Sequence, residues 1–350
     1  MQCPRSVALA ALAAALVPAL ARAEDPVAAL AHRIEQGSAQ LPFDSAYGYL
    51  PALLDALHVP VESQMAVFSK TSIQGLIIQT SNPRMLYFND SVAVGWVRGG
   101  FIELAAQDPG QGMAFYILLQ RPDERLTRRL DCVKCHQSAA TLLRSVTSAP
   151  LGLSSGAIDV DGRTPFNKLW GGWFVTGNTV PAGHAGEITP ALDPKFSLTR
   201  SSDIVALMVF AHQMHMMNLL AHPDNIDELV DYLLFVDEPP LPGPIRGSSG
   251  FAGKFSAAGP RDHKGRSLRD LDLERRLMRY PCSYMIYTEA FDALPAQAKE
   301  GVYGRVWQIL SGEVKAPRYE RLDPAGRKAV LEILRDTKKD LPDYFQRVSR

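Results

Sequence analysis

The chain lacks an excess of charge of either sign, a large number of cysteines, internal repeats and, beyond its N-terminus, any long hydrophobic run. Its 350 residues contain 37 Lys and Arg, 37 Asp and Glu, and 4 Cys. The even charge balance gives no indication of nucleic-acid binding. No stretch of 18 apolar residues follows the N-terminal run, so we expect no membrane span in the mature chain. The hydrophobic share of 46% is that of a globular protein that can bury its own core.

Residues 1–23 have the pattern of a signal peptide. Arg5 supplies a positive charge, a stretch rich in Ala, Val and Leu follows, and Ala21-Arg22-Ala23 is a small-x-small cleavage site. The alternative is a membrane anchor, but the apolar stretch is shorter than the ~20 residues that a span needs, and Pro18 interrupts it. We therefore expect residues 24–350 to be exported, to the periplasm or outside the cell.

One motif in the mature chain carries specific chemistry. Cys132-Val133-Lys134-Cys135-His136 has the Cys-x-x-Cys-His spacing of c-type haem attachment. Two thiols at this spacing add to the two vinyl groups of one porphyrin, and His136 then supplies its imidazole to the iron as the proximal ligand. Because the motif occurs once, the sequence predicts one covalent haem c.

Two other interpretations of this motif stay open. A structural zinc site would need a second Cys or His pair at similar spacing, and the remaining His residues are isolated. A Cys132–Cys135 disulfide is typical of a redox pair that lies between a strand and a helix, whereas a polar, charged segment precedes the motif here. The third mature cysteine, Cys282, is expected to be a small buried apolar residue.

The hydrophobic pattern predicts an α+β protein, with a β-rich N-terminal half leading into the haem motif and a mostly helical C-terminal half. Short runs rich in Val, Ile, Phe and Tyr, separated by Asn-Pro, Asn-Asp and Gly-Gly, indicate strands and hairpins. Runs with helical periodicity and capping residues indicate helices. The predicted strands are 75–80, 85–88, 92–97, 101–105 and 113–119, and the predicted helices are 25–36, 47–58, 204–221, 226–236, 268–279, 295–311 and 324–337.

The domain organisation is expected to be simple. Residues 24–350 are predicted to form a single large haem-binding domain, with a candidate sub-boundary near residues 190–200. Residues 237–264 are rich in Pro, Gly and Ser and are predicted to form a long loop. A small electron shuttle needs far less chain around one haem, so the surplus is expected to shape a substrate pocket, to dock a partner or to serve structure alone.

The second axial position of the iron decides what a haem protein does, because a tight ligand favours electron transfer and an open position favours catalysis or gas binding. Polar residues in an apolar helix need a partner, and iron would be one. We expect His212 to be the main candidate for the distal ligand, with His215 on the same helix face and His184 in a Gly-rich stretch as weaker ones. The alternative for each is a hydrogen-bonded core histidine. Three methionines, Met208, Met214 and Met217, are weaker candidates still.

Other residues carry less specific signals. The glycines between Trp170 and Trp173 allow close approach to a flat surface, either a porphyrin or a tightly packed neighbour. Arg261 and Arg266 are candidate contacts for haem propionates or an anionic substrate, and the alternative is a solvated basic face. The remaining histidines are expected to be surface or structural residues: His32, His58, His222 and His263.

Several stretches of the chain resemble a family of large, exported, single-haem c-type cytochrome-like proteins of bacteria whose function is uncharacterised. The resemblance covers most of the mature chain and implies export and one covalent haem c. The stretches outside the haem motif carry no known chemistry, so the resemblance transfers no catalytic role. They are residues 67–72, 83–90, 94–97, 170–177, 212–213, 279–281 and 289–295.

Together these features predict a periplasmic c-type haem protein that transfers electrons, with oxidation or reduction of a small substrate as a further role. The expected partner is a redox protein or a small-molecule substrate. Two alternatives remain at this point: a haem-based gas sensor or binding module, and a non-haem secreted protein with a Cys132–Cys135 disulfide.

Overall fold

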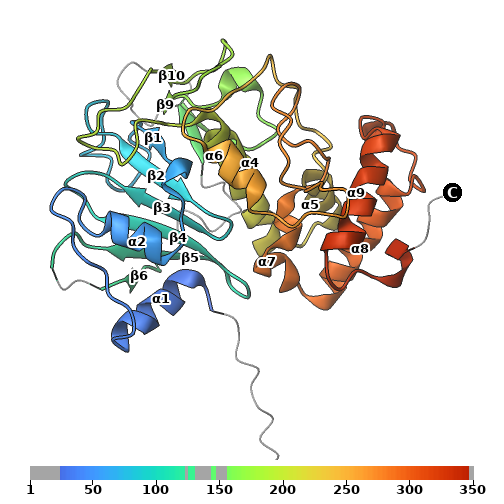
Figure 1. Ribbon diagram of the computed structural model, residues 1–350, viewed down its shortest axis with the longest axis horizontal. Helices are drawn as coiled ribbons and strands as arrows, with labels where there is room; N and C mark the ends of the chain where they lie inside the picture. The colour runs from blue at the N-terminus through green and yellow to red at the C-terminus, as the bar shows by residue number, and fades with distance from the viewer. Residues whose placement is uncertain (1–23, 123–124, 131–142, 147–155, 347–350) are drawn as a thin grey trace, which may run out of the picture.

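The computed structural model describes residues 24–122, 125–130, 143–146 and 156–346. An eight-stranded sheet with the strand order β10-β9-β1-β2-β3-β4-β5-β6 forms one half of the molecule (Figure 1). Neighbouring strands are antiparallel except β9 and β10, which are parallel, and β7 pairs with β8 in a separate two-stranded sheet. The strands are β1 (Met65–Val67), β2 (Arg84–Phe88), β3 (Val92–Trp96), β4 (Ile102–Asp108), β5 (Gly112–Leu118), β6 (Thr127–Arg128), β7 (Arg144–Val146), β8 (Ala157–Asp159), β9 (Trp173–Val175) and β10 (Glu187–Ile188).

The sheet separates two hydrophobic clusters because successive side chains of a strand point to opposite faces. In β2, Met85 and Tyr87 belong to the cluster under α1 (Pro26–Glu35) and α2 (Leu50–Ala56). Leu86 and Phe88 belong to the larger cluster on the other face. The sheet is therefore buried on both faces.

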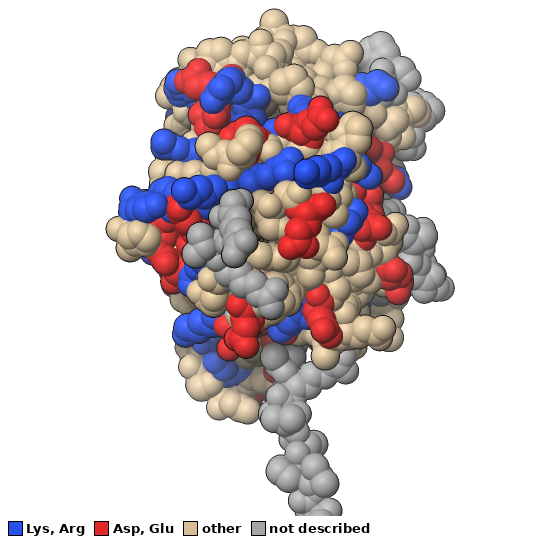
Figure 2. Space-filling view, turned by 90° about the vertical axis from the view of Figure 1, so that its right-hand side faces the viewer, with Lys and Arg blue, Asp and Glu red and all other residues tan. Residues whose placement is uncertain are grey.

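The C-terminal half is mostly helical and packs against the second face of the sheet (Figure 1). Its hydrophobic cluster extends along the chain from Met65 in β1 to Phe345, so both halves share one core. The helices are α4 (Ile204–Ala221), α5 (Ile226–Leu233), α6 (Phe251–Ala257), α7 (Glu289–Asp292), α8 (Ala296–Leu310) and α9 (Pro324–Thr337), with short 3-10 helices at Val61–Ser63, Phe166–Lys168, Tyr284–Tyr287, Pro317–Tyr319 and Asp343–Gln346. On the face made by the C-terminal helices, basic and acidic side chains are interleaved (Figure 2).

The central helix is α4, which has the bounds that the sequence predicts. The carboxylate of Asp203 accepts hydrogen bonds from the backbone N–H groups of Val205 (2.8 Å) and Ala206 (3.2 Å) and caps the first turn. Among the described residues, α4 is the one helix long and apolar enough to cross a membrane. It is buried over 78% of its length inside the protein, as a core helix is.

Arg269 links the sheet to the helical half. Its guanidinium lies over the rings of Phe255 (4.7 Å) and Tyr284 (4.3 Å) and forms an ion pair with Asp90 in the β2–β3 turn. Burial among aromatic rings strengthens both the cation–π contacts and the ion pair.

The predicted fold class is confirmed, since the described strands gather in the first half and the described helices mostly in the second. Three local predictions are wrong. Residues 75–80 form a turn rather than a strand, with Leu76 99% exposed. Residues 268–279 are not helical, because the carboxylate of Asp272 accepts the N–H groups of Glu274 and Arg275 and stabilises a turn, where Leu273 has φ +58°. The segment 237–264 contains helix α6 rather than loop alone.

Asp203→Ala is expected to lower the free energy of unfolding by about 3 kcal/mol. The substitution removes the cap of α4 and also leaves the N–H groups of Ser248 and Ser249 without the carboxylate oxygen that they contact at 2.7 and 2.8 Å. Urea denaturation measures the change. Asp323→Ala, which removes only the exposed cap of α9, is the matched control with an expected loss of about 1 kcal/mol. Equal losses of unfolding free energy in the two variants would contradict the role of Asp203 as a link between α4 and the segment at Ser248 and Ser249.

Candidate functional site

The haem motif itself, Cys132, Cys135 and His136, lies outside the described residues. The described chain stops at Leu130 on one side of the motif and resumes at Leu143 on the other. The surroundings of these two flanks therefore define the candidate site.

The first flank leaves the sheet beside the C-terminal end of α4. Strand β6 pairs antiparallel with β5, with Arg128 opposite Tyr116, and the N–H of Arg129 donates to the carbonyl of Phe115 at 2.8 Å. The chain thus runs toward Gly112, the first residue of β5. A Cβ atom at Gly112 would lie 3.1 Å from the Cβ of Ala221, the last residue of α4, so the two ends touch.

The second flank also leads to α4. Leu143 is buried, and its carbonyl accepts the N–H of Val160 at 3.2 Å. Two residues further on, the N–H of Gly162 donates to the hydroxyl of Tyr232 at 3.0 Å, and a Cβ at Gly162 would lie 3.7 Å from the Cα of His212 in α4. The neighbours of the two flanks, Gly112 in β5 and Gly162 after β8, are therefore packed against this helix.

The Gly-rich segment near Trp170 contacts β7 closely. The indole N–H of Trp173 donates to the carbonyl of Arg144 at 2.8 Å, and the N–H of Gly171 donates to the hydroxyl of Ser145 at 2.8 Å. A Cβ at Gly171 would lie 1.9 Å from the carbonyl oxygen of Val146. Glycine at this position therefore permits close approach of a backbone segment, which matches the packing alternative for this stretch.

His212 is enclosed in the core. Its side chain stacks on Tyr232 (5.0 Å between ring centroids) and Phe235 (4.4 Å), and its Nε2 lies 2.7 Å from the hydroxyl of Ser283. The residue is 1% exposed, and burial lowers the pKa of His212 to about 3. A haem iron could reach Nε2 only by displacing Ser283, so these contacts favour the structural alternative for His212.

His215 lies on the same face of α4 and belongs to a charged cluster. Its Nε2 is 3.1 Å from Nη2 of Arg163 and 3.8 Å from a carboxylate oxygen of Asp161, while Arg163 also pairs with Glu228 at 2.6 Å. A guanidinium only donates, so Nε2 of a neutral His215 accepts and the proton lies on Nδ1. That nitrogen is buried without a hydrogen-bond partner, and burial lowers the pKa of His215.

Sequence reasoning did not single out Asp161 or Arg163. Asp161-Gly162-Arg163 has the composition of a turn, and the carboxylate of Asp161 accepts the N–H of Arg163 at 2.7 Å as turn residues do. A turn pattern cannot indicate which helix the turn will pack against, so no local signal connects these residues with His215.

His184 packs edge-on against Trp170 (5.1 Å) and Phe166 (5.7 Å). Its Nδ1 accepts the N–H of Gly186 at 3.0 Å, and burial lowers the pKa of His184. The proton of the neutral ring therefore lies on Nε2, which is buried without a hydrogen-bond partner. In this arrangement the only lone pair of the imidazole is used by the backbone.

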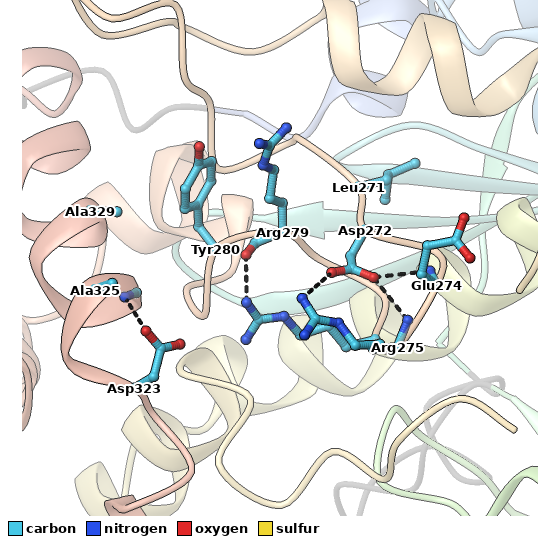
Figure 3. Close-up of a pocket in the computed structure, with 11 residues that line it drawn as sticks. Leu271, Asp272, Glu274, Arg275, Arg279, Tyr280, Asp323, Ala325 and Ala329 are labelled. Atoms are coloured by element: carbon cyan, nitrogen blue, oxygen red, sulfur yellow. Dashed lines mark hydrogen bonds and ion pairs between the residues drawn. The ribbon is translucent and has the colours of Figure 1, made fainter. Parts of the chain in front are cut away.

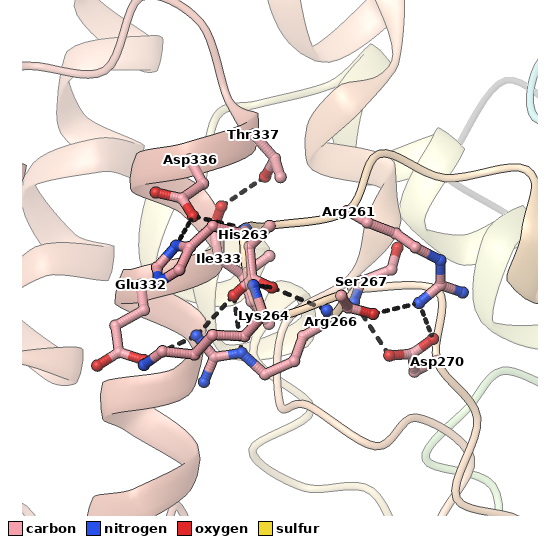
Figure 4. Close-up of polar contacts among 12 residues, drawn as sticks. Arg261, His263, Lys264, Arg266, Ser267, Asp270, Glu332, Ile333, Asp336 and Thr337 are labelled. Carbon is pink, nitrogen blue, oxygen red and sulfur yellow. Dashed lines mark hydrogen bonds and ion pairs between the residues drawn. The ribbon is translucent and has the colours of Figure 1, made fainter.

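Arg261 and Arg266 take part in ion pairs within the protein (Figure 4). Arg266 pairs with Asp262 at 2.6 Å and with Glu332 of α9 at 2.7 Å, and Arg261 pairs with Asp270 at 3.1 Å. Both guanidinium groups are thus neutralised by nearby carboxylates. Arg266 joins its loop to α9, and Arg261 holds the loop to Asp270 and to the carbonyl of Ser256 in α6. Nothing in these contacts favours a propionate or another anion.

Cys282 is buried and unpaired, as the sequence predicts, and burial raises the pKa of the Cys282 thiol. Within the described residues, no three His, Cys, Asp or Glu side chains are arranged to hold a metal ion.

A pocket of about 560 Å³ lies between the turn that precedes Tyr280 and the start of α9 (Figure 3). Its walls carry three arginines and three carboxylates, so the formal charges cancel and the pocket selects ions of neither sign. The charged residues are Arg275, Arg276, Arg279, Asp272, Glu274 and Asp323.

Comparison with known proteins gives no independent indication of the family or the function of this chain. No family model, no curated protein and no solved structure matches this chain.

The buried His212 is expected to make the protein less stable in acid. Its pKa is 6.5 when unfolded and about 3 when folded, so below pH 6.5 the unfolded chain binds a proton that the folded chain does not. The stability that the neutral, buried His212 gives the folded protein is fully present above pH 6.5. It is lost as the pH falls from 6.5 toward 3, and the free energy of unfolding then drops by about 1.4 kcal/mol per pH unit.

This pH dependence is measured by urea denaturation of the wild type and of His212→Gln between pH 7 and pH 4.5. The slope of unfolding free energy against pH should be shallower in the variant by about 1.4 kcal/mol per pH unit. His58→Asn, at an exposed histidine with φ +53° that Asn tolerates, is the control and should keep the wild-type slope. Identical slopes in His212→Gln and the wild type would show that His212 is charged in the folded protein.

Proposed function

We propose that the mature chain is an exported c-type haem protein that transfers electrons, with one haem c bound covalently to Cys132 and Cys135 and with His136 as the proximal iron ligand. The observation that carries the proposal is the single Cys-x-x-Cys-His motif in a chain whose first 23 residues have the pattern of a signal peptide. The two features support each other, because c-type haem is attached after export. When bound, the haem supplies a one-electron Fe(III)/Fe(II) couple.

The described residues offer a haem an apolar surface on α4. A porphyrin needs an apolar wall, and the outer face of α4 carries Met208 and Leu219, which are only partly buried. His215, on the same face, has its Nδ1 buried without a hydrogen-bond partner, but this nitrogen carries the proton of the neutral ring and Nε2 accepts from Arg163, so His215 has no free lone pair for iron. Gly112, in the strand that pairs with the first flank, and Gly162, two residues beyond the partner of Leu143, both lie against this helix.

The position of the first flank supports exchange of electrons with a partner. Leu130, the last described residue before the motif, is 74% exposed, and β6 is the edge strand of the sheet. A redox protein or a small substrate can approach this exposed end of the described flank.

Replacement of both motif cysteines, Cys132→Ala with Cys135→Ala, is expected to abolish covalent haem, because no thiol would remain to form the two thioether bonds. The protein is expressed with its signal peptide in a bacterium that has haem-attachment machinery. Intact mass and the pyridine haemochrome spectrum then measure bound haem. Cys282→Ser is the matched control and should retain one haem per chain, since that thiol is buried in the core.

A wild-type mass without added haem would contradict the proposal. If that mass were also two hydrogens below the reduced chain, the disulfide alternative would take its place.

A further inference from the structure

A second pocket, separate from the one beside Tyr280, lies at one end of the eight-stranded sheet. Its volume is about 580 Å³, and it is lined by the turn at residues 43–48, the turn between β3 and β4, and the residues that directly follow β5. Pockets that bury small ligands have volumes of roughly 300–1,000 Å³ and mostly apolar and aromatic walls. This pocket is therefore large enough to hold a small organic molecule.

The walls of this pocket are largely aromatic. Phe43 and Tyr47 come from the first turn. Trp96 is the last residue of β3, and Phe101 directly precedes β4. The ring centroids of Tyr47 and Trp96 are 5.8 Å apart, and Phe43 is 45% exposed although its side chain is large and apolar. Flat apolar surfaces from separate segments favour a planar aromatic ligand, which can stack on them or meet them edge-on.

Hydrogen bonds hold these walls in place. Asp44 and Gly48 exchange two backbone hydrogen bonds of 2.8 and 2.9 Å across the first turn. On the other side, the side-chain amide of Gln74 donates to the carbonyl of Phe101 at 3.0 Å and accepts the N–H of Phe101 at 2.9 Å. Because these segments are already ordered, a ligand loses little affinity to the ordering of its site.

The charged side chains of the pocket are basic. Arg98 and Arg121 line it, and within the described part of the chain no Asp or Glu does. Arg98 is exposed; its guanidinium donates to the carbonyl of Lys195 at 3.3 Å and forms no ion pair with a described carboxylate. Asp44 belongs to the first turn, but its carboxylate accepts two N–H groups of that turn. Carboxylates balance the arginines in the pocket beside Tyr280, whereas here they do not.

Arg98 determines which charge the ligand carries. Aromatic walls alone attract cations through the negative faces of their rings. A guanidinium beside those walls repels a cation, and its planar fork binds a carboxylate through two parallel hydrogen bonds. The combination of aromatic walls with Arg98 thus selects a ligand that is both planar and anionic.

We propose that this pocket binds a planar aromatic carboxylate, with its ring against the aromatic side chains and its carboxylate at Arg98. The proposal gives the chain a binding function beyond electron transfer and does not depend on the haem. The site lies beyond the C-terminal end of β5, whereas Gly112, which lies against α4, is at the other end of that strand.

The test is a calorimetric titration of the purified mature chain with cinnamate, a planar aromatic carboxylate. The wild type should bind one cinnamate per chain, and more tightly than the neutral cinnamamide. Cinnamylammonium, a cation of similar shape, should not bind. Arg98→Gln should raise the Kd for cinnamate about 10-fold, because the charged pair is lost. Phe43→Ala should also raise it, because part of the aromatic wall is removed.

Two further variants distinguish recognition of charge from damage to the fold. Arg98→Glu should reverse the preference, so that cinnamylammonium binds and cinnamate does not, a result that a misfolded protein would not give. Arg275→Gln, at an arginine of the other pocket whose side chain is 84% exposed, is the matched control and should keep the wild-type Kd.

The proposal would be overturned by a wild type that does not bind cinnamate with a Kd below about 1 mM. An equal Kd in Arg98→Gln and the wild type, cinnamylammonium binding as tight as that of cinnamate, or an Arg98→Glu protein that still prefers cinnamate would also overturn it. A chain without haem would contradict the proposed function but would leave each of these results with the same meaning.

Discussion

The burial of α4 is the constraint on which the rest of the structure depends. A helix that is apolar on nearly all sides must be covered all round, and here the sheet covers one side while other helices cover much of the rest. The sheet in turn needs α1 and α2 on its opposite face, since its strands are apolar on both sides. The layered α+β architecture follows from these two requirements.

Polar groups on and beside α4 determine how it sits on the sheet. The amide of Gln213 donates to the carbonyl of Asn89 in the β2–β3 turn at 2.6 Å and accepts the hydroxyl of Tyr284 at 2.6 Å. Gln107 of β4 donates to the carbonyl of Met217 at 3.2 Å. Because a buried polar group without a partner is costly, a shift of the helix by one residue would break several of these bonds at once.

Hydrogen bonds to the histidine rings decide which imidazole nitrogens remain available for chemistry. His212, His215 and His184 all attract notice in the sequence, and each has a lone pair or a ring nitrogen committed to a neighbour in the folded chain. Ion pairs likewise commit Arg261 and Arg266. The side chains that the sequence singled out as ligand or anion candidates are therefore held by neighbours within the described part of the chain.

The sequence by itself determined the elements whose signals are local: the capped apolar helix 204–221, the helix that starts at Pro324, and the apolar strands β2 and β3. It also contains the Cys-x-x-Cys-His motif at residues 132–136, on which the proposed haem attachment rests. Tertiary structure decided the rest, for a physical reason. The partners of the histidines, Ser283 and Arg163, lie 71 and 52 residues away along the chain. Contacts at such separations depend on how the layers pack, which no local pattern records.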